Sequence, residues 1–286
     1  MIDLHCHTTA SDGSKSPREF IQEAYEKRLQ VVAITDHDTI DGIEEAEREG
    51  EIKGIRVIPG IELSAESSEG NRHILGYHID PSNPELLKIL EENRQSRKGK
   101  IPKVIAALNA AGYDITLEEV KAKAAGTIGR PHVAAVLVEK GYEPSIKAAI
   151  NTGILADGGI ADIKRKKLTA EECVELITKA KGIAVLAHPY QTKLEGQALE
   201  KFIESLVPHG LKGIEVYYSE HTEDMMQEYK HIASKFSLIE TGGSDWHGSI
   251  KPHIQLGTGK GNLCVPQACV DALDNIKKEV SADVDI

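Results

Sequence analysis

The sequence has few cysteines and lacks any long apolar run, and these absences exclude several classes of protein. Its 286 residues include 4 cysteines, none of them in a Cys-x-x-Cys spacing. This argues against a disulfide framework and against a cysteine-based zinc site. No apolar run reaches the roughly 18 residues that cross a bilayer, and the first residues lack the basic-then-apolar pattern of a signal peptide. We therefore expect reduced thiols, no membrane association and a cytoplasmic location.

Aromatic residues and net positive charge are also scarce. The chain has 3 Phe and 1 Trp, and its formal net charge is -11. A surface that binds long nucleic acid needs basic residues to neutralise phosphates and aromatic rings to stack on bases, so we expect no long nucleic acid partner. Residues 94–167 are an exception, with 14 Lys and Arg against 7 Asp and Glu. This segment would steer a small anionic substrate, although solvated helix faces have a similar composition.

Short apolar runs alternate with amphipathic segments through much of the chain. Strands are predicted at residues 29–35, 56–58, 71–79, 182–187, 213–218 and 238–241, with a turn at Pro59 and Gly60. One helix is predicted to begin near Ser16 with Glu19 in its first turn, and others to span residues 41–53, 169–180, 195–206 and 223–235. Such alternation favours an α/β protein with a parallel sheet, and the number of units favours a closed or nearly closed β/α barrel.

One long segment interrupts this alternation. Residues 94–164 carry helical patterns at 101–111, 117–125 and 131–139 but no convincing strand. We therefore predict two domains, a barrel built from residues 1–93 and 165–286 and an inserted helical subdomain of residues 94–164 that binds substrate.

Histidines and carboxylates accompany most of the predicted strands. His5 and His7 lie two residues apart on an extended segment, so their imidazoles point to the same side, and Asp245 and His247 repeat this spacing. Active sites of β/α barrels form where the strands end. The candidate ligands at these positions are His5, His7, Asp12, His37, Glu62, His73, His188, Asp245 and His247.

The composition of this set indicates its chemistry. Imidazole and carboxylate without thiolate suit Mn, Fe or Zn in a hydrolytic site rather than a structural zinc. Nine ligands are too many for one ion, so we predict two or three divalent metal ions, Mn first among them, with Glu62 bridging. A single histidine at a strand end is usually an ordinary loop residue. The joint placement of nine such residues is what favours a metal site.

Other polar residues are excluded from the predicted site. His78 lies at an odd spacing from His73 and is expected on the opposite face of the strand. Asp36 and Asp38 flank His37 and are expected to orient it or to cap the next helix. The remaining histidines are expected at the surface: His209, His221, His231 and His253.

The arrangement resembles the polymerase and histidinol phosphatase (PHP) family of phosphoesterases over nearly the whole chain. The matching motifs lie at residues 3–13, 35–38, 59–62, 73–77, 187–189 and 243–248. The resemblance implies a distorted seven-stranded β/α barrel with a di- or trinuclear metal site. It implies one ion held by His5, His7, Glu62 and Asp245, a second by Glu62, His73 and His188, and a third by Asp12, His37 and His247.

The inserted segment resembles one subgroup of this family more than the others. Residues 128–132 and 137–142, with residues 213–218 later in the chain, look like the subgroup that hydrolyses nucleoside 3′,5′-bisphosphates or trims nucleotides from the 5′ end of short RNA. In that subgroup an arginine grips phosphate, which implies this role for Arg130, and His132 beside it is a candidate leaving-group acid. Arg130 could equally open a helix ahead of Pro131. The basic run from Lys164 to Lys167 departs from the subgroup pattern; it is either a solvated face or a second phosphate contact.

The predicted reaction is in-line attack on phosphorus by a metal-bridging hydroxide, without a covalent intermediate. The substrate would be a small phosphorylated molecule, a nucleotide or a short RNA. Two alternatives remain at this point. One is a different enzyme on the same fold, such as a phosphatase for histidinol phosphate or an exonuclease on longer strands. The other is a non-catalytic metal-binding or regulatory module.

Overall fold

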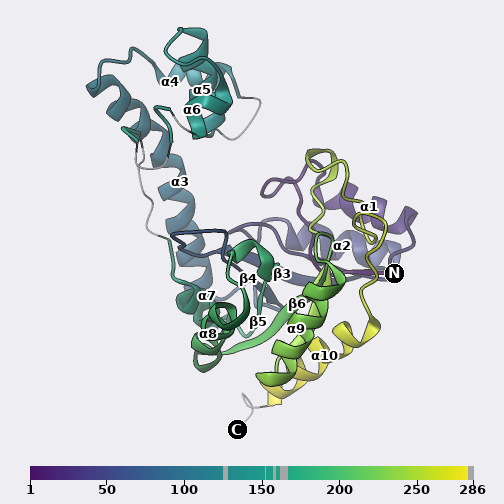
Figure 1. The fold of residues 1–286 in the computed structure, drawn as a ribbon. Helices are drawn as coiled ribbons and strands as arrows, with labels where there is room; N and C mark the ends of the chain where they lie inside the picture. The colour runs from purple at the N-terminus through teal and green to yellow at the C-terminus, as the bar shows by residue number, and fades with distance from the viewer. Residues whose placement is uncertain (125–127, 152, 157–158, 162–166, 283–286) are drawn as a thin grey trace. The chain divides into compact units, whose positions relative to one another are not determined.

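The computed structural model describes residues 1–124, 128–151, 153–156, 159–161 and 167–282 (Figure 1). The chain divides into two compact units. The first, called the barrel unit below, comprises Met1–Leu90 and Lys167–Ile286, and the second, called the helical unit, comprises Glu91–Lys166. Among the described residues, no helix combines the length and the apolar character needed to cross a membrane.

The barrel unit is built on one seven-stranded sheet whose strands follow each other in chain order, β1 to β7. Around it, helix α7 packs on β5, α9 on β6 and α10 on β7 (Figure 1). The strands are β1 (Ile2–Asp3), β2 (Val31–Ile34), β3 (Arg56–Ser64), β4 (His73–Tyr77), β5 (Ile183–Leu186), β6 (Leu211–Tyr218) and β7 (Ile239–Gly243). The helices are α1 (Pro17–Glu26), α2 (Ile43–Lys53), α7 (Ala170–Lys179), α8 (Gly196–Leu206), α9 (Glu223–Lys235) and α10 (Gln267–Ala282). The predicted α/β fold with a barrel of seven strands is confirmed.

Local sequence signals determine several helix starts. Ser16 caps α1: its side chain accepts from the Glu19 backbone N–H, and the Glu19 carboxylate bonds back to the Ser16 N–H. Thr169 and Glu172 form the same reciprocal pair at the start of α7. Each pair satisfies two backbone donors that the first turn of a helix leaves unpaired. The predicted start of α1 near Ser16 is therefore confirmed.

The prediction of an all-parallel sheet is wrong at one strand. β4 runs antiparallel to both β3 and β5, while the other neighbouring pairs are parallel. Only residues 65–72 separate β3 from β4. A parallel connection needs a dozen or more residues to cross back over the sheet, so this short loop forces a hairpin.

The predicted turn at Pro59 and Gly60 is also wrong, because both residues lie inside β3. Pro59 pairs in register with Ile34 of β2, and Gly60 pairs with Tyr77 of β4. An added Cβ at Gly60 would lie 2.8 Å from the Gly76 carbonyl oxygen. The glycine therefore allows neighbouring backbone to approach closely rather than marking a turn.

The barrel closes between the segment after β1 and the segment around β7. The Leu4 N–H donates to the Gly242 carbonyl (3.2 Å), and the Asp245 N–H donates to the His5 carbonyl (2.9 Å). At Gly243 the two backbones are so close that an added Cβ would lie 2.3 Å from the backbone nitrogen of His5. The barrel can close at this point because glycine has no side chain.

We expect the substitution Gly243→Ala to destabilise the barrel by about 2–4 kcal/mol, because the added methyl group must push the two backbones apart. Thermal unfolding of the purified variant measures the effect. Gly99→Ala is the matched control, because Gly99 lies inside helix α3 with nothing within 4 Å of an added Cβ. The control should unfold at or slightly above the wild-type temperature, since Ala is the better helix former. Equal unfolding temperatures for Gly243→Ala and wild type would contradict the closure argument.

Two apolar clusters stabilise the barrel unit. The larger joins residues of α1, α2, α7, α8 and α9 to the sheet, and includes Phe20, Ile177 and Ile203. The smaller joins strand residues such as Ile2 and Val185 to α10. The sequence patterns did not predict α10.

The helical unit has its own apolar cluster, which includes Val104, Val133 and Leu137. Its helices are α4 (Leu117–Ala122), α5 (Arg130–Glu139) and α6 (Ile146–Asn151), together with the part of α3 (Pro84–Ala110) from Glu91 onward. α3 begins far earlier than the predicted residue 101, at Pro84, where Asn83 accepts hydrogen bonds from the N–H groups of residues 85 and 86. α6 was not predicted.

Candidate metal centre

The nine candidate ligands come from loops and strands that end at one edge of the sheet. His5 and His7 follow β1, His37 follows β2, His188 follows β5, and Asp245 follows β7. His73 is instead the first residue of β4. Because β4 is antiparallel to its neighbours, its start lies at the edge where the other strands end. The reversed strand thus places its first residue beside the ends of the others.

Glu62 lies at the centre of the cluster and is fully buried. Its Oε1 atom lies 2.8 Å from His73 Nδ1 and 2.9 Å from His188 Nε2. Its Oε2 atom faces a different set of nitrogens, those of His37 (3.0 Å, Nδ1), His7 (3.2 Å, Nε2) and His5 (3.3 Å, Nε2). One carboxylate that presents its two oxygens to two groups of imidazoles is the arrangement expected of a bridging ligand.

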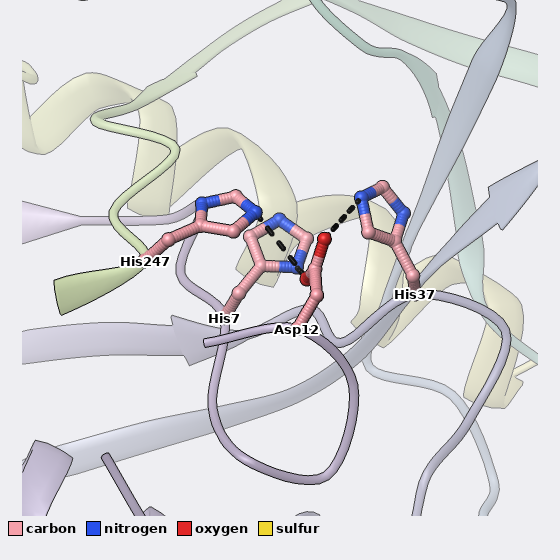
Figure 2. Close-up of side chains that lie close together, drawn as sticks. All are labelled: His7, Asp12, His37 and His247. Carbon is pink, nitrogen blue, oxygen red and sulfur yellow. Dashed lines mark ion pairs between the residues drawn. The ribbon is translucent and has the colours of Figure 1, made fainter. Parts of the chain in front are cut away.

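Asp245 and Asp12 extend the cluster on either side of His7. Asp245 Oδ1 lies 3.2 Å from His7 Nε2 and 3.7 Å from His5 Nε2. Figure 2 shows Asp12 between His37 and His247, with His7 beside them; its carboxylate lies 3.9 Å from His37 Nε2 and 3.3 Å from His247 Nε2. Within the described residues, potential ligand atoms group as His7, Asp12, His37 and His247; as His5, His7 and Asp245; as His5, Glu62 and His188; and as His37, Glu62 and His73.

Several buried nitrogen and oxygen atoms of these side chains have no hydrogen-bond partner, which is consistent with a role as metal ligands. Buried polar atoms in proteins almost always have a hydrogen-bond partner. Here His5 Nε2, both ring nitrogens of His7, His37 Nδ1 and Glu62 Oε2 are buried without one. Each of these atoms lies within 4 Å of another candidate ligand, and imidazole and carboxylate donors of this kind suit divalent cations.

The charges within the cluster are strongly coupled. Burial raises the pKa of the Glu62 carboxyl, but the imidazoles of His37, His73 and His5 outweigh it and hold this pKa well below its usual range. Burial lowers the pKa of His7, but Asp245 and Glu62 outweigh it and raise the pKa to about 9. The Glu62 carboxyl therefore favours its ionised form, and a metal ion that binds His7 displaces the proton of this imidazole.

Two candidate ligands have unusual backbone conformations. Asp245 has φ +58° and His188 has φ +24°. Residues other than glycine rarely adopt positive φ, and such strain persists at sites where the surrounding structure imposes it. Both side chains contact the cluster: His188 Nε2 lies 2.9 Å from Glu62 Oε1, and Asp245 Oδ1 lies 3.2 Å from His7 Nε2.

Glu215, on β6, is a site residue that the sequence analysis missed. It is fully buried, and its Oε1 lies 3.0 Å from His5 Nδ1 while its Oε2 accepts from the His188 backbone N–H at 2.7 Å. A carboxylate on the far nitrogen of a ligating imidazole fixes the ring and its tautomer. The available signal was a charged residue inside the apolar strand pattern of residues 213–218.

We expect Glu215→Gln to weaken metal binding by about 10- to 100-fold, the usual cost of losing a carboxylate behind a ligating histidine. Titration of the metal-free protein with Mn²⁺ measures the effect. Glu240→Gln is the control, because Glu240 lies on the next strand, β7, and accepts a bond from Tyr217. If Glu215→Gln bound Mn²⁺ as tightly as the wild type, Glu215 would have no positioning role.

Neither Asp36 nor Asp38 caps helix α2, although capping was one of the two roles expected for them. Asp36 binds the loop that carries Asp12, accepting from the Thr8 N–H (2.7 Å) and the Ser11 hydroxyl (2.6 Å). α2 begins after Gly42 without any side-chain cap, so the capping prediction is wrong. Asp38 accepts from the Ser64 N–H at 2.9 Å.

Two of the histidines left out of the site are informative. His78 lies outside the cluster, with Nε2 3.4 Å from Asp274. His221 is buried, not at the surface as predicted, because its ring packs against Tyr218 and Tyr229 and bonds the Val216 carbonyl.

Arg130 and His132 lie in the helical unit, at the first turn of α5. The Gly129 N–H donates to His132 Nδ1 at 3.0 Å, so the imidazole caps this helix and its Nδ1 carries no proton. Arg130 is the first residue of the helix. In the basic run, Lys164, Arg165 and Lys166 lie outside the described residues.

Comparison with known proteins identifies the family. Residues 3–188 match the model of the PHP domain. The chain is 34% identical over 245 residues to the 5′-3′ exoribonuclease of Haemophilus influenzae, covering 86% of this chain and 89% of that protein. It is 31% identical to the 3′,5′-nucleoside bisphosphate phosphatase of Chromobacterium violaceum, covering 86% of this chain and 87% of that protein.

A further relative and a solved structure agree with this placement. The phosphoribosyl 1,2-cyclic phosphate 1,2-diphosphodiesterase of Eggerthella lenta is 31% identical, with 88% of this chain and 97% of that protein covered. A crystal structure from Bifidobacterium adolescentis, described as a metal-dependent phosphoesterase, superposes with a TM-score of 0.74 at 29% identity, covering 96% of each chain. The chain belongs to the PHP domain family. The predictions of a PHP-type barrel and of a phosphoric ester hydrolase are confirmed.

Proposed function

We propose that this protein is a metal-dependent phosphoesterase that hydrolyses nucleotide phosphate esters, either nucleoside 3′,5′-bisphosphates or the 5′ end of short RNA. The observation that carries the proposal is Glu62, whose two oxygens face two separate groups of imidazoles. Two of the relatives are named for these substrates, a bisphosphate phosphatase and an exoribonuclease.

Within this proposal the nine candidate ligands hold two or three divalent ions, with Mn²⁺ as the first choice. When bound, the ions would lower the pKa of water and neutralise phosphate oxygens. Glu215 would keep His5 oriented, and Glu62 would fix the spacing between neighbouring ions. Three ions are favoured because the potential ligand atoms of Asp12, His37 and His247 group with those of His7 and not with those of His188.

In the helical unit, Arg130 is proposed to bind a substrate phosphate. A guanidinium at a helix start presents forked donors that match phosphate oxygens. If His132 acts as the leaving-group acid, as we propose, its Nε2 atom donates the proton, because Nδ1 already accepts a hydrogen bond from the Gly129 N–H. All four cysteines are free thiols, which supports the proposed cytoplasmic location.

A base-free sugar phosphate is a second candidate substrate. The observation that favours it is the 31% identity to a cyclic phosphodiesterase acting on a phosphoribosyl compound, over 97% of that protein. The same ligand cluster would serve a cyclic phosphodiester, since both reactions need phosphate oxygens neutralised at the metal centre.

The deciding experiment is hydrolysis by the Mn-loaded protein across a panel of substrates. The panel holds adenosine 3′,5′-bisphosphate, a short 5′-phosphorylated RNA, phosphoribosyl 1,2-cyclic phosphate, histidinol phosphate and an aryl phosphate. We expect the bisphosphate or the RNA to be the best substrate, activity to vanish after chelation, and Mn²⁺ to restore it. Preference for the cyclic sugar phosphate would select the second candidate, and full activity in excess chelator would refute both.

A further inference from the structure

One carboxylate oxygen of Asp245, Oδ2, accepts hydrogen bonds from two side chains that the metal site itself does not require. Oδ1 is the atom that faces His5 and His7. Oδ2 accepts from the Tyr218 hydroxyl and from the Lys251 ammonium, both at 2.7 Å. One buried hydroxyl would suffice to keep this carboxylate binding through a single oxygen, so the lysine needs its own explanation.

The two donors differ in their surroundings. Tyr218 ends β6 and is buried, packed between His188 and His221. The Lys251 side chain is 35% exposed. An ammonium has three N–H donors, and Asp245 Oδ2 accepts one. Lys251 therefore combines contact with a candidate ligand and access from solvent, as a substrate-binding cation must.

The backbone around Lys251 is fixed close to the cluster. The residue follows a short 3-10 turn at Gly248–Ile250, directly after His247. The Ser249 N–H donates to the Ser14 hydroxyl (2.8 Å), and the Ile254 N–H donates to the Lys251 carbonyl (2.9 Å). A cation held in this way meets an incoming anion without first having to be ordered.

We propose that Lys251 is a phosphate-binding residue of this site: it donates to an oxygen of the substrate phosphate while Tyr218 keeps Asp245 in place. The proposal deepens the proposed phosphoesterase function and names a contact from the barrel unit itself. Its chemistry is a charge-assisted hydrogen bond between ammonium and phosphate, which is roughly twice as strong as a neutral one.

Binding of inorganic phosphate to the Mn-loaded protein, measured by calorimetric titration, tests the proposal. We expect Lys251→Met to keep its full Mn content and to bind phosphate about 10-fold or more weakly, the usual effect of losing one hydrogen bond to a charged group. Lys251→Arg should retain most of the affinity. The probe contains no nucleotide, so failure of the nucleotide proposal would leave this result unaffected.

Two matched variants make the test discriminating. Tyr218→Phe removes the other donor to Asp245 Oδ2; it should weaken Mn²⁺ binding but leave phosphate affinity unchanged once the ions are loaded. Lys260→Met removes a lysine of similar exposure, 44%, that pairs with Glu220 instead; it should change neither quantity. Wild-type phosphate affinity in Lys251→Met would overturn the proposal. Equal losses in Lys251→Met and Tyr218→Phe would also overturn it, because the effect would then act through Asp245.

Discussion

Glu62→Gln is expected to lower kcat by about 10³-fold or more and to reduce the bound metal by at least one ion per chain. The substitution keeps the shape of the side chain but replaces one oxygen by an amide nitrogen, which cannot bind a cation. The two oxygens of Glu62 face His73 and His188 on one side and His5, His7 and His37 on the other. One group therefore loses its oxygen, and both groups lose the negative charge of the carboxylate. Several kcal/mol of charge stabilisation correspond to an effect of this size.

Metal content by elemental analysis and steady-state turnover with the best substrate measure this effect. Glu240→Gln serves again as the control, since it is the same chemical change on β7, where the carboxylate accepts a hydrogen bond from the Tyr217 hydroxyl. A Glu62→Gln variant with a full metal complement and near-wild-type turnover would refute a bridging role.

Arg130→Ala is expected to lower kcat/KM by about 100-fold while the metal content stays at the wild-type value. The guanidinium would contribute a bidentate, charge-assisted bond to phosphate, and its loss removes binding without touching any of the nine candidate ligands. Arg130→Lys should recover only part of the loss, because an ammonium lacks the forked geometry.

Arg94→Ala is the matched control for this change. Arg94 also belongs to the helical unit, and its side chain is exposed and paired with Glu91. If Arg130→Ala left kcat/KM unchanged, Arg130 would serve only to open α5. If it lowered the metal content as well, its effect would be structural rather than a loss of phosphate binding.

The sequence by itself determined the local chemistry of the site. The spacing of His5 and His7 predicts that both side chains point to one side of an extended segment, and this alternation is a local property of the backbone. The same spacing at Asp245 and His247 does not lie on extended backbone, because Asp245 has φ +58°. The start of α1 was equally local, since Ser16 and Glu19 satisfy the first turn by themselves. These features depend on neighbours within a few residues, so they can be predicted without tertiary structure.

The tertiary structure decided which residues meet. The reversal of β4 follows from a loop too short for a crossover, and it brings His73 to the edge where the other strands end. For Glu215 the local pattern shows only a charged residue inside an apolar strand; its partners His5 and His188 lie 210 and 27 residues away, so its role depends on the fold. The pairing of Lys251 with Asp245 likewise depends on how the loop after β7 folds back. Such contacts are set by strand order and packing, which no short stretch of sequence encodes.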